Sequence, residues 1–385
     1  MLKPVTHITI TTKENTLFFD FVTHWEYNDG WQNLTSNGKV VFPKNIYVTD
    51  TQTQKRFQLF GANKSINALF KRGDKIKIET FYIYWDRNLN EKRTTKVIAA
   101  EGYISKVGSG MPIEIEFEDN MWLLKQIPLK NQSFAKGTSI ESILTDALQG
   151  TGLTVNYLTT TKLVFDNALL SAENETVAQF LAKLRKDAFL FSYFRGSELR
   201  VGSFVYIEAE AKQKKFVFQD NIISSDLSYS NKNDIVLSAV ASNHITENTG
   251  QTTKDGYAKT RNKRIEVLVT LKNDKVIVKE VAKGEKADPN TDGERRTFTF
   301  LQARTTKELA DLAEAELRKY YYTGFKGSFT TFGTPYVQFG DNAQIVNDKL
   351  NDQTGIYKIK EVEYSGGIDG YRQKITLDYK INTDA

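Results

Sequence analysis

Four neighbouring carboxylates are the residues of this chain whose types and spacing could do chemistry: Glu114, Glu116, Glu118 and Asp119. Glycosidases use a pair of carboxylates that flank the bond they cleave. The three glutamates alternate with apolar residues, however, as side chains on one face of a β-strand do. A solvated strand face explains this pattern without catalysis, so we expect no catalytic residue here.

Other reactive groups are sparse. The chain has no cysteine, and none of its three histidines, His7, His24 and His244, has a metal-binding spacing. The Gly-Lys pair at 38–39 is followed by valine, so it is not a P-loop. Residues 107–110 are too short for a dinucleotide-binding loop and indicate a turn. The sequence therefore predicts no catalytic, cofactor-binding or metal-binding residue.

Three aromatic residues near the N-terminus, Trp25, Tyr27 and Trp31, leave several interpretations open. Such side chains can stack on a sugar, form the edge of a core, or lie in a protein interface. They are the reason why a carbohydrate-binding β protein stays among the alternatives.

A three-strand pattern occurs twice in the sequence, and these strands form the scaffold that positions any functional residues. Each copy has a Gly-Asp turn, an alternating strand, a strand led by glycine and a third alternating strand. The first copy contains Gly73, Asp74, Gly102 and residues 113–117, and the second contains Gly340, Asp341, Gly355 and residues 373–377. We expect residues 70–117 and 336–379 to be superposable and to belong to two small β-barrels.

The middle of the chain has a different pattern. Helices are predicted at 138–150, with Thr138 and Glu141 as a capping box, and at 176–188, with Thr176 and Gln179. Strand-like segments lie beside them at 153–157, 189–195 and 198–201. These elements predict a compact α+β domain.

The last third returns to β structure. Strands are expected at 216–218, 227–229 and 235–242, a polar loop at 243–263, a hairpin of 264–271 and 275–281, and another loop at 283–293. A third helix is predicted at 305–321, capped by Thr305 and Glu308.

Composition excludes several classes of protein. No apolar run is long enough to span a membrane, and the N-terminus has no apolar core of a signal peptide. The absence of cysteine fits assembly in a reducing cytoplasm. The net charge of +5 over 385 residues is small, so specific nucleic-acid binding is not expected.

The order of several motifs resembles the baseplate hub family of phage tails, which includes late-control protein D. The N-terminal hub part of VgrG-type spikes and of tail-associated proteins is similar. The motifs are residues 118–126, with Asp119 and Trp122; residues 176–202; the closing run with Gly327, Gly333, Pro335, Gly340 and Asp341; and residues 355–362.

The resemblance implies a homotrimer whose two barrels alternate round a ring, with the middle domain outside it. Such a ring joins a hexameric tail tube, or a distal tail protein, to a central spike. VgrG-type chains continue into the spike, whereas this chain ends at Ala385. We therefore expect the spike to be a separate protein.

We expect a β-rich α+β fold, with two small barrels flanking a central α+β domain. The expected domains are 1–118, 119–205 and 206–385, the last interrupted by an insertion at 243–300. The expected function is a non-enzymatic hub of a phage tail or contractile injection particle, assembled in the bacterial cytoplasm. A carbohydrate-binding or adhesion protein is the alternative, and a glycosidase comes third.

Overall fold

The structure, a computed structural model, describes residues 2–59, 69–130, 133–135, 137–159, 169–170, 174–188, 190–203, 205–252, 258–281, 294–300, 303–350 and 353–381. Three large hydrophobic clusters organise this part of the chain. The first lies under a large sheet, the second in the middle of the chain, and the third beneath helix α5 (Thr306–Tyr320).

The large sheet contains strands from both the N-terminal and the C-terminal part of the chain. Its N-terminal strands are β1 (Leu2–Thr11), β2 (Thr16–Phe19), β3 (His24–Gly30), β4 (Asn37–Phe42), β5 (Tyr47–Asp50), β6 (Arg56–Gln58), β7 (Lys75–Trp85), β8 (Glu91–Arg93), β9 (Val97–Val107) and β10 (Ile113–Glu118). Its later strands are β16 (Gln213–Val217), β17 (Ile222–Ser225), β24 (Ser328–Phe332), β25 (Asn342–Val346), β26 (Gly355–Gly367) and β27 (Arg372–Lys380).

The pairing path of this 16-stranded sheet runs β17-β24-β27-β26-β3-β4-β10-β9-β7-β1-β2-β5-β6. Strands β25 and β16 branch from β26, and β8 branches from β7. The path passes from the second module to the first through β26 and β3, and one hydrophobic cluster lies under both. The predicted β-rich α+β class is confirmed, while the described strand pairings close neither module into a barrel.

The Gly-Asp turn of the first copy is held by three hydrogen bonds. The Gly73 N–H donates to the Ile104 carbonyl over 2.8 Å, and the Ile104 N–H donates to the Asp74 carbonyl over 2.8 Å. The Asp74 carboxylate accepts the Lys71 N–H over 2.7 Å. Gly73 has a φ of +93°, which favours glycine.

The turn of the second copy repeats these bonds. Gly340 donates to the Ile359 carbonyl over 2.7 Å, and Ile359 donates to the Asp341 carbonyl over 2.9 Å. The Asp341 carboxylate accepts the Gln338 N–H over 3.0 Å, and Gly340 has a φ of +85°. Each turn opens an antiparallel three-strand meander, β7-β9-β10 in one copy and β25-β26-β27 in the other. The two copies therefore share one strand connectivity.

The alignment of the middle strands differs from the one that the sequence indicated. Both strands carry a β-bulge, which leaves Ser105 and Lys360 without an opposite residue in β10 and β27. With the bulges matched, Gly102 corresponds to Tyr357 rather than to Gly355. Gly102 lies within β9 and does not begin it. A Cβ atom there would lie 1.9 Å from the Glu118 carbonyl oxygen, so close strand packing requires glycine at this position.

The middle unit contains the predicted helices and strands, α3 (Ile140–Leu148), α4 (Val177–Ala188), β12 (Thr154–Leu158), β14 (Phe191–Arg195) and β15 (Glu198–Gly202). It also contains three short elements that were not predicted, α2 (Met121–Leu124), β11 (Ser133–Phe134) and β13 (Leu169–Leu170). Strand β15 lies between β12, which is parallel to it, and β14, which is antiparallel. Thr176 and Gln179 form the predicted capping box of α4. The cap of α3 is Ser139, whose hydroxyl accepts the Ser142 N–H, so the prediction of Thr138 was wrong.

The third unit is a four-stranded sheet covered by α5. Its strands are β19 (Val236–Thr252), β20 (Ala258–Lys272), β21 (Lys275–Glu280) and β22 (Glu294–Thr299), in the order β21-β20-β19-β22. Helix α5 is capped by Thr305, as predicted, and packs its buried face on β19 and β20. Short elements link this unit to the large sheet: β18 (Ser228–Ser230), η2 (Lys232–Asp234) and β23 (Gly324–Lys326). The short helix η1 (Glu208–Glu210) lies between the middle unit and β16.

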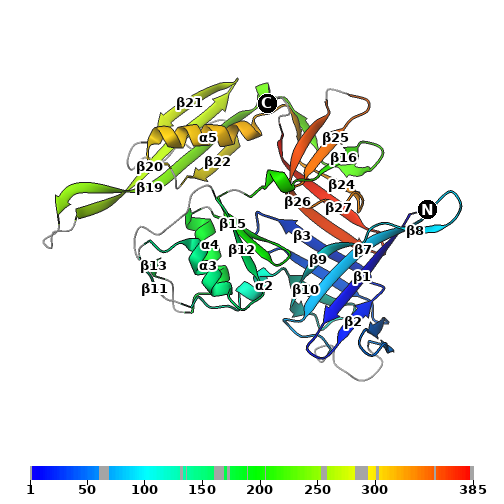
Figure 1. The fold of residues 1–385 in the computed structure, drawn as a ribbon. Helices are drawn as coiled ribbons and strands as arrows, with labels where there is room; N and C mark the ends of the chain where they lie inside the picture. The colour runs from blue at the N-terminus through cyan, green and yellow to red at the C-terminus, as the bar shows by residue number, and fades with distance from the viewer. Residues whose placement is uncertain are drawn as a thin grey trace.

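The prediction of a polar loop at 243–263 was wrong. Strands β19 and β20 continue through most of this segment as one long antiparallel hairpin, which Figure 1 shows extending beyond the helix. The predicted turn between β20 and β21 is confirmed, with positive φ at Asn273 and Asp274. The expected loop at 283–293 lies outside the described residues.

Candidate functional site

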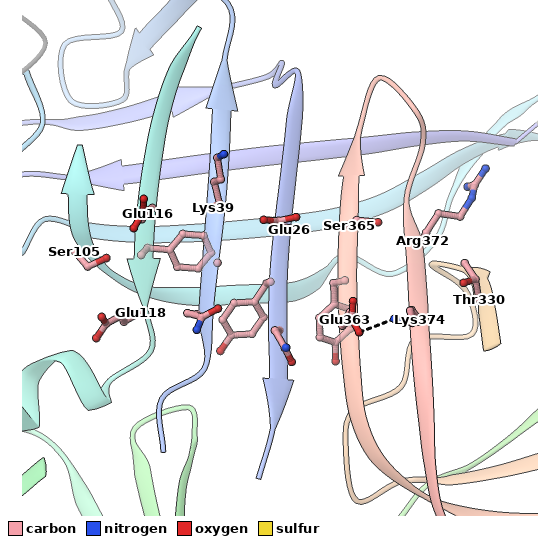
Figure 2. A pocket seen from close by; sticks show the side chains of 16 residues that line it. Glu26, Lys39, Ser105, Glu116, Glu118, Thr330, Glu363, Ser365, Arg372 and Lys374 are labelled. Atoms are coloured by element: carbon pink, nitrogen blue, oxygen red, sulfur yellow. Dashed lines mark hydrogen bonds and ion pairs between the residues drawn. The ribbon is translucent and has the colours of Figure 1, made fainter. Parts of the chain in front are cut away.

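A concave groove crosses the large sheet where the two modules meet (Figure 2). Its volume is about 770 Å³, and it runs over β9, β10, β4, β3, β26, β27 and β24. The strand register places two polar rows on this face. One row is Lys106, Glu116, Lys39, Glu26, Ser365 and Arg372, and the other is Glu118, Asn37, Asn28, Glu363, Lys374 and Thr330.

Ion pairs connect neighbouring strands along this face. Lys374 Nζ lies 3.0 Å from Glu363 Oε1, and Figure 2 marks this contact. Lys106 Nζ lies 2.8 Å from Glu116 Oε1, and the interaction raises the pKa of the lysine. The groove is thus lined by charges of both signs.

A buried row of residues on the opposite face of the sheet crosses from one module to the other. The register aligns Phe117, Gly38, Tyr27, Tyr364 and Gln373 across five consecutive strands. The Tyr27 ring stacks on Phe117 at 5.7 Å and on Tyr364 at 6.3 Å between centroids. A Cβ atom at Gly38 would lie 2.4 Å from the Phe117 ring, so glycine makes room for this stacking.

The candidate catalytic glutamates are ion-paired residues of a solvated strand face. Glu114, Glu116 and Glu118 have side-chain exposures of 49%, 46% and 22% and pair with Lys39, Lys106 and Lys125. The groove shares Glu116 and Glu118 with this face. No group of three or more His, Asp or Glu in the described ranges could hold a metal ion. Within the same ranges, no helix is both long and apolar enough to cross a membrane.

Replacing all three of these glutamates with glutamine is expected to leave the fold intact. Partly exposed ion pairs of this kind contribute at most about 1 kcal/mol each. The free energy of unfolding in urea should therefore fall by less than about 3 kcal/mol, with an unchanged m-value. Hydrolysis of cell-wall or capsule glycans by the wild type, and its loss in this variant, would contradict the structural interpretation.

The aromatic residues considered for sugar binding are mostly in the core. Trp25 is 0% exposed and Tyr27 is 8% exposed, so neither offers a ring face to a ligand. Trp31 is partly buried, and its Nε1 donates to the Tyr206 hydroxyl over 2.8 Å. No described feature of these three residues favours a carbohydrate-binding site.

The remaining motif residues have packing roles. Trp122 stacks on Tyr103 at 5.3 Å, and a Cβ atom at Gly73 would lie 2.9 Å from its ring. A Cβ atom at Gly333 would lie 1.8 Å from Tyr371. The carbonyl of Pro335 accepts a hydrogen bond from the buried Gln373 side chain. Gly355 is the first residue of β26, and a Cβ atom there would lie 2.9 Å from the Tyr357 hydroxyl oxygen.

A buried polar network, which the sequence did not reveal, joins all three parts of the chain that meet here. Asp119 accepts N–H groups from Met121 and Ser36, and the Ser36 hydroxyl donates to Asp29 over 3.2 Å. Arg195 Nη1 lies 3.3 Å from Asp29 Oδ2. Burial raises the pKa of both aspartates, that of Asp119 to about 7.

The guanidinium of Arg195 also reaches the second module. It donates to the Phe339 carbonyl and lies 3.7 Å from the centre of the Phe339 ring. Phe339 directly precedes the Gly340-Asp341 turn, whereas Arg195 lies at the end of β14 in the middle unit. We call Asp119, Ser36, Asp29, Arg195 and Phe339 the central clasp. Only Asp119 was singled out by the sequence analysis. Arg195 and Phe339 lie within motif ranges but were not identified individually, because their contacts bring together residues that are distant in the sequence.

Comparison with known proteins gives matches to solved structures alone; no family model and no curated protein matches the chain. The 43 kDa tail protein of prophage MuSo2 from Shewanella oneidensis is 11% identical over 98% of both chains, with a TM-score of 0.55. A tail protein from Neisseria meningitidis MC58 is 12% identical over 99% of this chain and 97% of its own, with a TM-score of 0.54.

A third structural match is an E. coli component of the type VI secretion system, described as structurally similar to the T4 bacteriophage tail proteins gp27 and gp5. It is 8% identical over 98% of this chain and 77% of its own, with a TM-score of 0.50. At these identities the matches establish a shared fold. The chain has the fold of phage tail proteins over nearly its whole length.

Proposed function

We propose that this protein is a structural, non-enzymatic hub of a phage tail or of a phage-derived contractile injection particle. The observation that carries the proposal is one sheet built from two modules with the same turn, bulge and strand connectivity. Whole-length similarity in fold to a prophage tail protein and to a second tail protein supports it.

The duplicated module gives the hub its geometric task. Three chains arranged about a three-fold axis present six similar modules, which match a six-fold tail tube or distal tail protein. The same ring presents true three-fold symmetry to a separate central spike. The predicted barrel domains, 1–118 and 206–385, are the parts that form the ring, and the middle unit at 119–205 lies outside it.

The polar groove suits the wall of a channel through this ring. Its charged lining consists of four carboxylates, Glu26, Glu116, Glu118 and Glu363, and three cations, Lys39, Arg372 and Lys374. Such a mixture stays hydrated without the strong single-sign field that would hold a charged cargo. We place this face toward the lumen of the ring, in a particle assembled in the bacterial cytoplasm.

Electron microscopy of the assembled particle tests the proposal. We expect three copies of the chain, six similar modules around a channel, and the polar rows facing that channel. Mass measurement of the purified protein over a range of concentrations provides a preliminary test, since ring formation depends on concentration. One copy per particle, a dimer, or modules facing away from the axis would overturn the proposal.

A further inference from the structure

The third unit is a separate body with its own hydrophobic core. The described residues of its hydrophobic cluster all lie between Ile235 and Tyr321, outside the cluster under the large sheet. The chain enters the unit after β18 and leaves it before β23, and these two strands pair with each other in a two-stranded sheet. Figure 1 shows α5 and its sheet to one side of the large sheet. Two adjacent chain crossings allow rotation, so contacts elsewhere must fix the position of the unit.

The last turn of α5 makes such a contact with β27. Tyr320 is the last residue of α5, and its ring lies edge-on to the Tyr379 ring of β27, with 6.1 Å between centroids. Lys319 Nζ lies 6.0 Å from the centre of the same Tyr379 ring. Arg296 of β22 lies over the Tyr320 ring, 3.6 Å from its centre. The contact is therefore aromatic and polar, unlike the apolar packing inside each unit.

One carboxylate, that of Asp378, is shared by both sides of this contact. It accepts a hydrogen bond from the Tyr206 hydroxyl and another from the Tyr320 hydroxyl. Burial raises the pKa of Asp378, and the two hydroxyls oppose that shift because they stabilise the ionised form. Asp378 thus ties α5 to β27 and to the segment between β15 and η1.

The Tyr206 hydroxyl extends this connection to other parts of the chain. It donates to Asp378 and accepts the Nε1–H of Trp31 over 2.8 Å. The Trp31 ring lies edge-on to Phe191 of β14, with 4.9 Å between centroids. Trp31 follows β3 of the first module, and Phe191 belongs to the middle unit. A line of contacts therefore leads from α5 to the junction of the first module with the middle unit.

We propose that Asp378 is a latch that docks the third unit against β27, and that the unit rotates about β18 and β23 when the latch opens. The hydrogen bond from Tyr206 to Asp378 is half-buried, so water replaces it at a small net cost in free energy. The Tyr206 hydroxyl then loses its acceptor, which changes its bond to Trp31. The position of the third unit is thereby coupled to the middle unit. The latch lies within one chain, so it operates whether or not the chain forms the proposed trimer.

Distances between two spin labels test the latch, because the native chain has no cysteine that would also be labelled. Ala315→Cys, on the exposed side of α5, and Lys215→Cys, in β16, place one label on each side of the contact. Labelled protein diluted with unlabelled chain should give one narrow distance distribution in the otherwise native sequence. Adding Asp378→Ala should broaden this distribution or add a second distance. Asp369→Ala, in the exposed turn before β27, is the matched control and should leave it unchanged.

A second variant covers the case in which Asp378→Ala fails to fold. Tyr320→Phe keeps the ring and removes only the hydroxyl, so it should broaden the distance distribution while the circular dichroism spectrum stays that of the wild type. A distribution that stays narrow in both folded variants would overturn the latch. A broad distribution in the otherwise native sequence would overturn it as well.

Fluorotryptophan NMR tests the coupling to the middle unit. The chain has four tryptophans, and Trp31→Phe assigns the Trp31 signal. Asp378→Ala should shift that signal and leave the signal of Trp122, which stacks on Tyr103, in place. An unchanged Trp31 signal in a variant whose third unit is released would overturn the coupling and leave the latch standing. The number of copies in the particle decides the hub proposal separately.

Discussion

Replacing Arg195 with methionine is expected to lower the free energy of unfolding by about 3 kcal/mol or more. The guanidinium is the ion-pair partner of Asp29, whose side chain is 12% exposed, and its removal would leave that carboxylate buried and unpaired. The Phe339 carbonyl would lose its donor, and the ring would lose its cation–π contact. The loss is large because one side chain holds three parts of the chain.

Urea unfolding of the full chain at neutral pH measures this effect. Arg318→Met is the matched control, because Arg318 pairs with Glu314 on the exposed side of α5 and should cost well under about 1 kcal/mol. Adding Asp29→Asn to Arg195→Met should restore part of the loss, since residue 29 then carries no unpaired buried charge. If both arginine variants lose the same small amount, the central clasp contributes nothing to stability.

Local signals in the sequence predicted the three longer helices, the strands of the repeated module and the longer strands of the middle unit. The capping box of α4 and the cap of α5 were predicted correctly because a hydroxyl three residues before its donor is a short-range pattern. The cap of α3 was misplaced by one residue, because Thr138 and Ser139 are adjacent and both have suitable hydroxyls. The choice between them depends on backbone geometry that side-chain types do not specify.

The long hairpin was missed for a different reason. Apolar alternation in β19 and β20 covers only the part beneath α5, where residues such as Leu237 and Val267 are fully buried. Beyond it, the strands continue as a ribbon held by backbone pairing, which needs no apolar side chains. A polar composition therefore suggested a loop where the backbone forms strands.

The repeat was visible in the sequence, but its exact alignment was not. The Gly-Asp turns are local and were identified by residue type. The equivalence of Gly102 with Tyr357 depends on the bulges at Ser105 and Lys360, which only the cross-strand register reveals. The clasp was unpredictable for the same reason, because Arg195 and Asp29 are 166 residues apart.

Asp119 should make the stability of the protein depend on pH. The carboxylate is 6% exposed, and burial raises its pKa to about 7, aided by Asp29 and Glu118 and opposed by the N–H groups of Met121 and Ser36. Its ordinary value is 3.8, so between these two values the folded state binds a proton that the unfolded state releases. Stability from this group therefore rises as the pH falls toward 4 and is lowest above 7.

Comparison of the wild type with Asp119→Asn isolates this contribution. Asparagine keeps a side-chain oxygen that can accept the Met121 N–H, but it cannot titrate. Its loss of the bond to the Ser36 N–H changes the unfolding free energy by the same amount at every pH. The unfolding free energy of the wild type relative to the variant should rise by about 2 kcal/mol between about pH 8 and about pH 5. Asp311→Asn, on the exposed side of α5, should show no such trend. A difference between wild type and Asp119→Asn that stays constant with pH would mean that Asp119 is ionised throughout this range, and that the buried network accommodates its charge.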